Sequence, residues 1–99
     1  MLKNYKQILK DHDFRHRYLY DEKDNRVGVI VIVKEGKGNF KKYYTGYSIC
    51  SKQENNFNKK LGKAIAILRA KSGKADLDKI PKRFKTQVER KLPTMFVKY

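Results

Sequence analysis

The apolar run Val27–Val33 (VGVIVIV) constrains the fold of this 99-residue chain more than any other segment. All of its residues except Gly28 are β-branched, which favours an extended backbone. Its side chains are apolar on both faces of the pleat, which indicates a central position in a sheet. The run is also much shorter than the roughly 18 apolar residues that cross a bilayer. It therefore predicts the central strand of a sheet in a globular domain.

Two further strands are expected on either side of this run in the sequence, each joined to it by a turn. Phe14–Tyr20 alternates large and charged side chains, and the polar residues 21–26 (DEKDNR) follow as a hairpin turn. Residues 34–39 (KEGKGN) supply two glycines for a second turn, and Phe40–Ile49 is a third segment rich in tyrosine. Three strands joined by tight turns predict an antiparallel meander.

Helices are predicted before and after the meander. Residues 3–10 repeat apolar side chains at helical spacing. After the third strand, either Asn55 or Asn56 can cap a second helix, which is expected to stop near Gly73. The stripe of this helix that is expected to face the core consists of Phe57, Leu61, Ala64, Ile65 and Leu68.

Small residues form another side of this second helix, namely Gly62, Ala66 and Ala70, and they allow a second element to approach closely. The last helix is expected to open at Asp76 or Asp78, to tolerate Pro81 in its first turn and to end at Pro93. The small-residue side of the second helix is expected to receive the apolar stripe of the last one, which consists of Phe84, Val88 and Leu92.

Together these elements predict one α+β domain over residues 1–99, a three-stranded antiparallel β-meander packed by helices in the order α-β-β-β-α-α. Residues 3–72 form its α-β-β-β-α core, with helices against one face of the sheet, and residues 76–99 add a basic helix and tail. The final segment 94–99 (TMFVKY) is apolar enough either to pack or to extend a sheet edge. The single Cys50 and the lack of a signal-peptide pattern predict a cytoplasmic location, and no membrane partner is expected.

Positive charge is the strongest global feature of the sequence. The chain has 25 Lys and Arg against 10 Asp and Glu, a formal net charge of +15, with most of the excess in the second half. Such a charge opposes compactness through self-repulsion, so a polyanionic partner is a natural interpretation. The alternative is a solvated lysine surface that keeps a small protein soluble.

The leading candidate site is the lysine-rich second helix. Side chains at i and i+4 project together, so Lys59 and Lys63 can meet adjacent phosphates about 6–7 Å apart along one strand. A second candidate is the tyrosine-rich strand, where Tyr43 and Tyr47 share a face opposite to Tyr44 and exposed rings can stack bases, although core packing is the favoured role. The predicted nucleic-acid-binding residues are Lys59, Lys60, Lys63, Arg69, Lys71 and Lys74 on the second helix, Lys82, Arg83 and Lys85 on the last helix, and Lys41 and Lys42 before the tyrosines.

No pattern in the sequence supports catalysis, a metal or a cofactor. His12 and His16 have the i, i+4 spacing of a helical metal site, but His16 is expected in a strand, where the two rings are too far apart. Ser48 lacks the G-x-S-x-G context of a nucleophile, and Cys50 is expected to fill core space. His16 can still join a basic surface with Arg15 and Arg17.

Two resemblances accompany this interpretation. The order α-β-β-β-α over residues 3–72 resembles the double-stranded-RNA-binding domain, in which a K-K-x-A-K cluster opens the helix after the third strand; here KKLGK (59–63) stands at that place. The glycine-rich lead and the histidine loop of that family are absent. The pattern Gly46, Ser48, Cys50, Phe57, Gly62, Lys63, Ile65, Ala66, Arg69 and Ala70 is similar to that of small uncharacterised phage-encoded proteins.

The sequence thus predicts a non-catalytic protein that binds the phosphate backbone of a nucleic acid whose type is open. The phage resemblance implies an alternative, an inhibitor that binds an acidic surface of a host or defence protein in the host cytoplasm. A third interpretation is self-association through the third strand or the tail.

Overall fold

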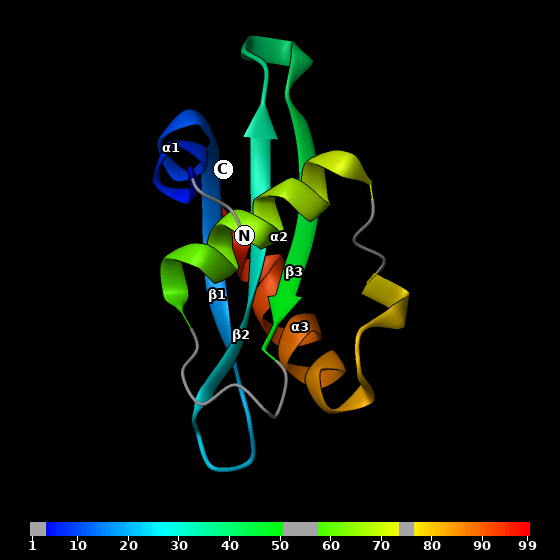
Figure 1. Cartoon of the computed structure of the whole chain (residues 1–99). Helices are drawn as coiled ribbons and strands as arrows, with labels where there is room; N and C mark the ends of the chain where they lie inside the picture. The colour runs from blue at the N-terminus through cyan, green and yellow to red at the C-terminus, as the bar shows by residue number, and fades with distance from the viewer. Residues whose placement is uncertain (1–3, 51–57, 74–76) are drawn as a thin grey trace.

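The computed structural model describes residues 4–50, 58–73 and 77–99, and it confirms the α+β class and the predicted order of elements (Figure 1). The strands are β1 (Asp13–Tyr20), β2 (Arg26–Glu35) and β3 (Lys42–Ile49). The helices are α1 (Tyr5–Asp11), α2 (Lys59–Ser72) and α3 (Lys82–Met95), with short 3-10 turns η1 (Gly38–Phe40) and η2 (Leu77–Lys79).

The sheet is an antiparallel meander in the order β1-β2-β3, so the strand built on Val27–Val33 is central, as predicted. Residues 29–33 of β2 are fully buried. Because successive side chains of a strand point to opposite faces, Val29, Val31 and Val33 lie on one face and Ile30 and Ile32 on the other. The sheet therefore has two apolar faces, and each needs its own cover.

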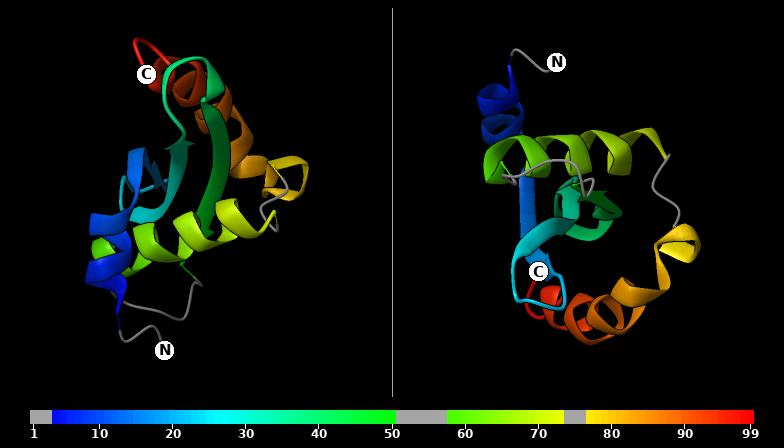
Figure 2. Two further views of the ribbon diagram at one scale, coloured as in Figure 1. Left: turned by 90° about the horizontal axis from the view of Figure 1, so that it is seen from above. Right: turned by 60° about the horizontal axis from the view of Figure 1, so that its bottom comes forward.

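Helices cover both faces of the sheet, so the expectation that they pack against one face is wrong. Figure 2 shows α2 on one side of the sheet and α3 on the other. The valines of β2 pack with Ile67 of α2, and Ile8 and Leu9 of α1 lie at the margin of that cluster. Ile30 and Ile32 pack instead with Phe84, Val88 and Met95 of α3. The consecutive apolar side chains of β2 explain this arrangement, because a single helical layer would leave one face in water.

The side of α2 that meets the sheet is its small-residue side, not the predicted stripe. Ala66 and Ala70 are buried against β2 and β3 together with Ile67, which the predicted stripe did not include. Of the described stripe residues, Ala64 is fully buried, Leu61 and Ile65 are partly buried, and Leu68 is 38 % exposed. A Cβ added at Gly46 of β3 would lie 2.2 Å from the Ala66 carbonyl oxygen. Close approach of the backbones therefore decides which side of the helix docks, and the partner of the small-residue side is β3 rather than α3.

The start of α2 also differs from the prediction. The helix is capped by Asn58, whose side-chain oxygen accepts a hydrogen bond from the Leu61 N–H at 3.0 Å. The two candidates Asn55 and Asn56, and Phe57 of the predicted stripe, lie outside the described residues. At the other end, Gly73 adopts the left-handed conformation with φ 71°, which confirms the expected stop.

Helix α3 continues past the proline that was expected to end it. Pro93 lies inside the last turn, and the helix runs to Met95, whose side chain is fully buried. A proline here removes one N–H donor, but burial of Met95 against the sheet favours the extra turn. At the other end the helix begins at Lys82 rather than at Asp78, which lies in η2, and Asp76 lies outside the described residues. Pro81 occupies the position before the first helical residue, and the predicted stripe residues Phe84 and Val88 are buried.

Side chains of the helices cover backbone groups at both edges of the sheet. On β1, the Lys91 ammonium donates to the Tyr18 carbonyl at 2.8 Å, and the Gln87 amide pairs with both the N–H and the carbonyl of Tyr20. On β3, the Arg69 guanidinium donates to the Tyr47 carbonyl at 3.2 Å. These contacts occupy groups that otherwise template pairing with another chain.

Candidate nucleic-acid interface

The N-terminal end of α2 presents three lysines, Lys59, Lys60 and Lys63. Lys59 and Lys60 are exposed, and Lys63 is half-buried. The first turn holds no acidic residue, and no carboxylate among the described residues is paired with any of the three. Lysine is electrostatically unfavourable at this end, where the helix dipole and the free N–H groups are already positive. Helix stability therefore does not explain these lysines.

The aromatic ring of Tyr18 on β1 connects this helix end to the sheet. The Lys63 ammonium lies 5.7 Å from the ring centroid, and the Arg26 guanidinium from β2 lies 4.9 Å from the same centroid. The His16 imidazole meets the ring edge-on at 5.2 Å. Cations at such distances interact with the π face of a ring, so Tyr18 holds together groups from three elements. We call Lys59, Lys60, Lys63, Arg26, His16, Arg17 and Tyr18 the α2 basic cluster.

His16 responds to the charge of this cluster. Partial burial, followed by the positive charges of Lys63 and Arg17, lowers the pKa of His16 below its usual 6.5. The imidazole is consequently neutral at pH 7, and its protonation is disfavoured while the lysine and arginine remain uncompensated. An anion bound here would reverse that effect.

Acidic residues gather in the β1–β2 turn, next to the cluster in sequence. Asp21 accepts hydrogen bonds from the backbone N–H groups of Asn25 and Lys23, both at 2.9 Å. These bonds, that from Asn25 foremost, lower the pKa of Asp21, so its charge is fixed in the turn. Glu22 and Asp24 are also exposed there. The turn therefore places three acidic side chains next to the basic residues of β1 and β2 in the sequence.

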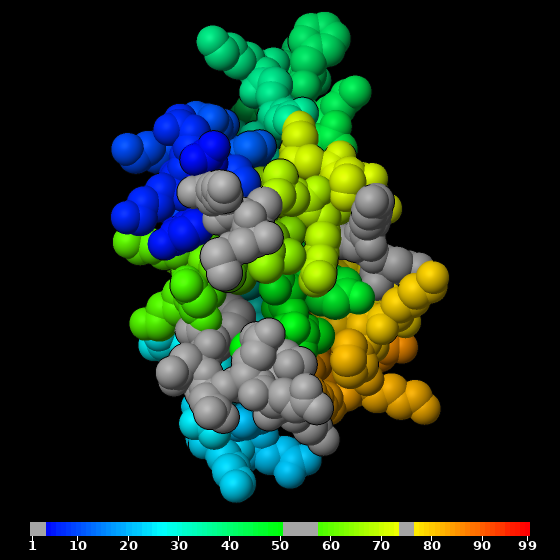
Figure 3. Space-filling model, viewed as in Figure 1, coloured from blue at the N-terminus to red at the C-terminus, as the bar shows by residue number. Residues whose placement is uncertain are grey.

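Figure 3 shows where α1 and α2 lie on the front face of the molecule. The N-terminal end of α2 protrudes at the left of the view, below α1, and the body of the helix crosses the front. Lys59 and Lys60, in the first turn of this end, are exposed, whereas Lys63 lies over the Tyr18 ring of β1.

Two of the other predicted α2 residues have partners inside the protein. The Lys71 ammonium forms an ion pair with Glu35 and lies 5.0 Å from the Tyr44 ring centroid. Arg69 is exposed but donates to the Tyr47 carbonyl, as described above. Lys74 lies outside the described residues. Arg69 and Lys71 thus each have a contact within the protein, whereas Lys59, Lys60 and Lys63 have no carboxylate partner among the described residues.

The structure does not bring the remaining predicted basic residues to the α2 basic cluster. Lys82, Arg83 and Lys85 lie in the first turn of α3, which covers the opposite face of the sheet (Figure 2). Lys82 and Arg83 are exposed, and Lys85 is partly buried. Lys41 and Lys42 are exposed at the start of β3, beside the β2–β3 hairpin.

The three tyrosines of β3 lie on the two faces of the sheet in the way that their alternation along the strand predicts. Tyr44 packs at the margin of the α2-side core, and Tyr47 packs at the margin of the α3-side core. Tyr43 is 40 % exposed. Packing is therefore the main role of two of them, and only Tyr43 presents a large part of its ring to solvent.

Sequence reasoning missed Arg26 and Tyr18 as members of the cluster. Arg26 lies opposite Tyr20 in the β1–β2 register, although the turn separates them in the chain. The alternation of Phe14–Tyr20 already placed His16 and Tyr18 on one face, and that is the signal that was available. The distance from Lys63 to this face depends on how α2 crosses the sheet, which no local pattern encodes.

The residues considered for metal binding or catalysis do not converge. The His12 Nδ1 lies 2.7 Å from the Ile8 carbonyl oxygen at the end of α1, whereas His16 lies on β1 within the basic cluster. In residues 4–50, 58–73 and 77–99, no three His, Cys, Asp or Glu side chains come together as a metal site. Ser48 is buried at the sheet and Cys50 is half-buried.

Within the same described ranges, no helix has both the length and the apolar content needed to cross a membrane. A comparison with known proteins found no match among family models, curated proteins or solved structures.

Proposed function

We propose that this protein is a non-catalytic nucleic-acid-binding protein that contacts the phosphate backbone through Lys59, Lys60 and Lys63, with Arg26 beside them. The observation that carries the proposal is the placement of three lysines, without carboxylate partners among the described residues, at the positive end of α2. Such a concentration of charge is costly without a ligand and favourable with a bound polyanion.

Phosphate groups suit this arrangement better than isolated carboxylates do. Lys59 and Lys63 project from the same side of the helix one turn apart, which corresponds to the spacing of phosphates along one strand. The net charge of +15 also attracts a polyanion over long distances and speeds association at low salt. The contacts proposed here go to the backbone alone, so shape rather than base sequence governs binding.

The proposal predicts strong dependence of binding on salt. We expect duplex or single-stranded DNA or RNA to bind at low salt, with log K falling linearly against log salt and a slope near −0.9 for each phosphate contact to a duplex. Fluorescence anisotropy with the four polymers at several salt concentrations measures that slope.

The main competing function is binding to an acidic surface of another protein. A protein partner recovered from nuclease-treated lysate, combined with no binding of any of the four polymers at low salt, would support that function and contradict the present proposal. Recovery of partners that disappear after nuclease treatment agrees with nucleic-acid binding.

Binding is also expected to take up a proton at His16. Lys63 and Arg17 disfavour the imidazolium in the free protein, and phosphates near Lys63 would offset their charge and raise the pKa of His16. Affinity should therefore rise as the pH falls toward the lowered pKa of His16 in the free protein, by up to about tenfold for each unit by which binding raises that pKa. In the free protein, the stability that neutral His16 contributes is present above pH 6.5 and declines below it.

The variant His16→Gln provides the control for this pH dependence. It keeps a polar side chain on β1 but cannot take up the proton, so its affinity should change little over the same pH range. Equal pH dependence in the variant and the original protein would assign the effect to another group.

A further inference from the structure

A second surface combines exposed aromatic rings with basic side chains. The Tyr43 ring of β3 meets the Phe96 ring edge-on at a centroid distance of 5.6 Å, and it lies 5.8 Å from the Tyr99 ring. Tyr43 and Phe96 are 40 % and 41 % exposed, and Val97 between the two tail rings is 61 % exposed. Figure 2 shows the C-terminal tail beside the β2–β3 hairpin, on the α3 side of the sheet. We call Tyr43, Phe96, Val97 and Tyr99 the tail ring patch.

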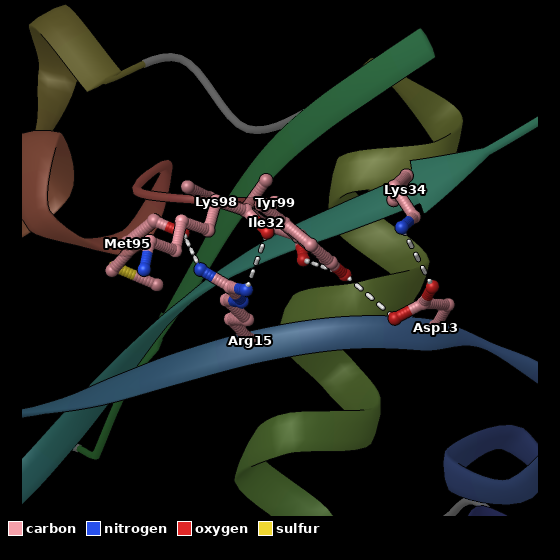
Figure 4. A network of polar contacts seen from close by, with 7 residues as sticks. All are labelled: Asp13, Arg15, Ile32, Lys34, Met95, Lys98 and Tyr99. Atoms are coloured by element: carbon pink, nitrogen blue, oxygen red, sulfur yellow. Dashed lines mark hydrogen bonds and ion pairs between the residues drawn. The ribbon is translucent and has the colours of Figure 1, made fainter. Parts of the chain in front are cut away.

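The tail is fixed in place by a network centred on Arg15 (Figure 4). The Arg15 guanidinium donates to the carbonyls of Met95 and Lys98 at 3.1 and 3.2 Å, and also to that of Val97. These bonds satisfy carbonyls that the end of α3 leaves free. The tail therefore packs on the sheet, which resolves the alternative between packing and strand extension.

Tyr99 is held from several sides within this network. Its hydroxyl donates to the Asp13 carboxylate at 3.0 Å, and its ring lies 4.3 Å from the Arg15 guanidinium and 4.8 Å from the Lys34 ammonium. Burial, followed by the contact with Asp13, raises the pKa of the Tyr99 hydroxyl, which keeps its proton. Tyr99 thus supports the patch from behind, and Tyr43 and Phe96 present the accessible ring surface.

The charge around the patch is predominantly positive. Lys41 is two residues from Tyr43 along extended backbone, so the two side chains lie on the same side, and Lys98 follows Val97 in the tail. Both lysines are exposed, and neither pairs with a carboxylate among the described residues. The carboxylate of Asp13 is already bound by Lys34 at 3.4 Å and by Tyr99. An exposed lysine therefore lies two residues from each of the two exposed rings in the chain, Lys41 from Tyr43 and Lys98 from Phe96.

We propose that the tail ring patch binds single-stranded nucleic acid, with bases stacked on Tyr43 and Phe96 and phosphates held by Lys41 and Lys98. Rings fixed in the fold lose little entropy on stacking, and every base offers a π face to them. A duplex hides its base faces, so this surface distinguishes unpaired from paired strands. The inference shares with the proposed function only the class of polymer, because the patch lies on the other face of the sheet from α2.

The test compares ligands that carry equal phosphate charge with and without bases. Fluorescence anisotropy at low salt measures binding of a short oligo(dT) and of an abasic oligomer of the same length. The original protein should bind oligo(dT) about tenfold or more tightly than the abasic strand, since stacking one base contributes about 1–3 kcal/mol. The double variant Tyr43→Leu/Phe96→Leu keeps apolar packing, removes both rings and should lose this preference.

Two control variants complete the experiment. Tyr5→Leu removes a ring from α1, on the opposite face of the sheet, and should keep the preference for oligo(dT). Lys59→Glu/Lys63→Glu changes only the end of α2, on the opposite face of the sheet, and should therefore keep the ring-dependent preference for oligo(dT) over the abasic strand. The melting temperature of each variant, followed by circular dichroism, shows whether it is folded.

Failure of this inference alone gives a different result from failure of the proposed function. Equal affinity for oligo(dT) and the abasic strand overturns the inference and leaves phosphate binding through α2 intact. A preference for oligo(dT) that survives in the folded ring variant also overturns it. Ring-dependent binding to anionic lipid vesicles, with no ring dependence for oligo(dT), would assign the patch to a membrane surface instead. Absence of binding to any polymer contradicts both proposals.

Discussion

Reversing the charge of Lys59 and Lys63 together is expected to weaken nucleic-acid binding at low salt by about a hundredfold or more. Each lysine that contacts a phosphate contributes about 1.5–3 kcal/mol, and a glutamate in its place adds repulsion. The neutral pair Lys59→Gln/Lys63→Gln should lower the magnitude of the log K against log salt slope by about 2. Anisotropy titrations over a salt series measure both effects.

The same double variant should melt at nearly the original temperature. Glutamate at the N-terminal end of α2 interacts favourably with the helix dipole, by about 0.3–1 kcal/mol. That gain offsets the loss of the contact between Lys63 and the Tyr18 ring, which is worth a similar amount. A loss of binding in this variant therefore cannot be assigned to unfolding, and a thermal scan by circular dichroism verifies it.

The matched control is Lys82→Glu/Lys85→Glu, which changes the net charge equally on the opposite face of the sheet. If the α2 basic cluster is the main contact, this control should weaken binding severalfold at most. Equal losses in the two double variants would show that overall charge, rather than the end of α2, determines affinity.

Placing a side chain at Gly46 is expected to produce a large loss of stability. The Cβ of Gly46→Ala would lie 2.2 Å from the Ala66 carbonyl oxygen and 2.8 Å from both the Ala70 Cβ and the Ala70 nitrogen. Two of these atoms belong to the backbone of α2, so the helix must move away from the sheet. We expect a loss of about 3 kcal/mol or more in the free energy of unfolding, measured by urea denaturation.

Two further variants distinguish steric overlap from the conformational freedom of glycine. Gly38→Ala lies in open space at a φ of 60°, and it should cost only the 1–2 kcal/mol or so of a left-handed residue. Adding Ala70→Gly to Gly46→Ala removes one of the three overlapping atoms and should restore little stability. Near-complete rescue, or equal losses at Gly46 and Gly38, would contradict the close contact between α2 and β3.

Local sequence patterns predicted the strands and the approximate extent of the helices, but not the orientation of α2. Leu61, Ile65 and Leu68 form the more apolar stripe, and hydrophobic spacing alone selects it for the core. The structure instead buries Ala66 and Ala70, because Gly46 allows the backbones of helix and strand to approach closely. This fit depends on the shapes of two segments that are separated in the chain, and a helical period does not contain that information.

The candidate site, too, could be predicted from the sequence only in part. The three lysines that open α2 were evident from the KKLGK sequence, and their i, i+4 spacing follows from helix geometry. That Lys71 pairs with Glu35, and that Arg26 shares the Tyr18 ring with Lys63, follows only from the way α2 crosses the strands. Helix and hairpin must be docked before such side-chain pairs can be identified.

By itself the sequence determined the central strand, the meander, the order of the elements and the excess of positive charge. These properties depend on β-branching, turn residues and apolar periods, which act between near neighbours in the chain. Tertiary structure alone decided that helices cover both faces, that the tail packs through Arg15, and which cations remain without carboxylate partners among the described residues. The physical reason is that both apolar faces of the sheet must be buried, whereas which helix buries each face depends on steric fit between segments that are distant in the chain.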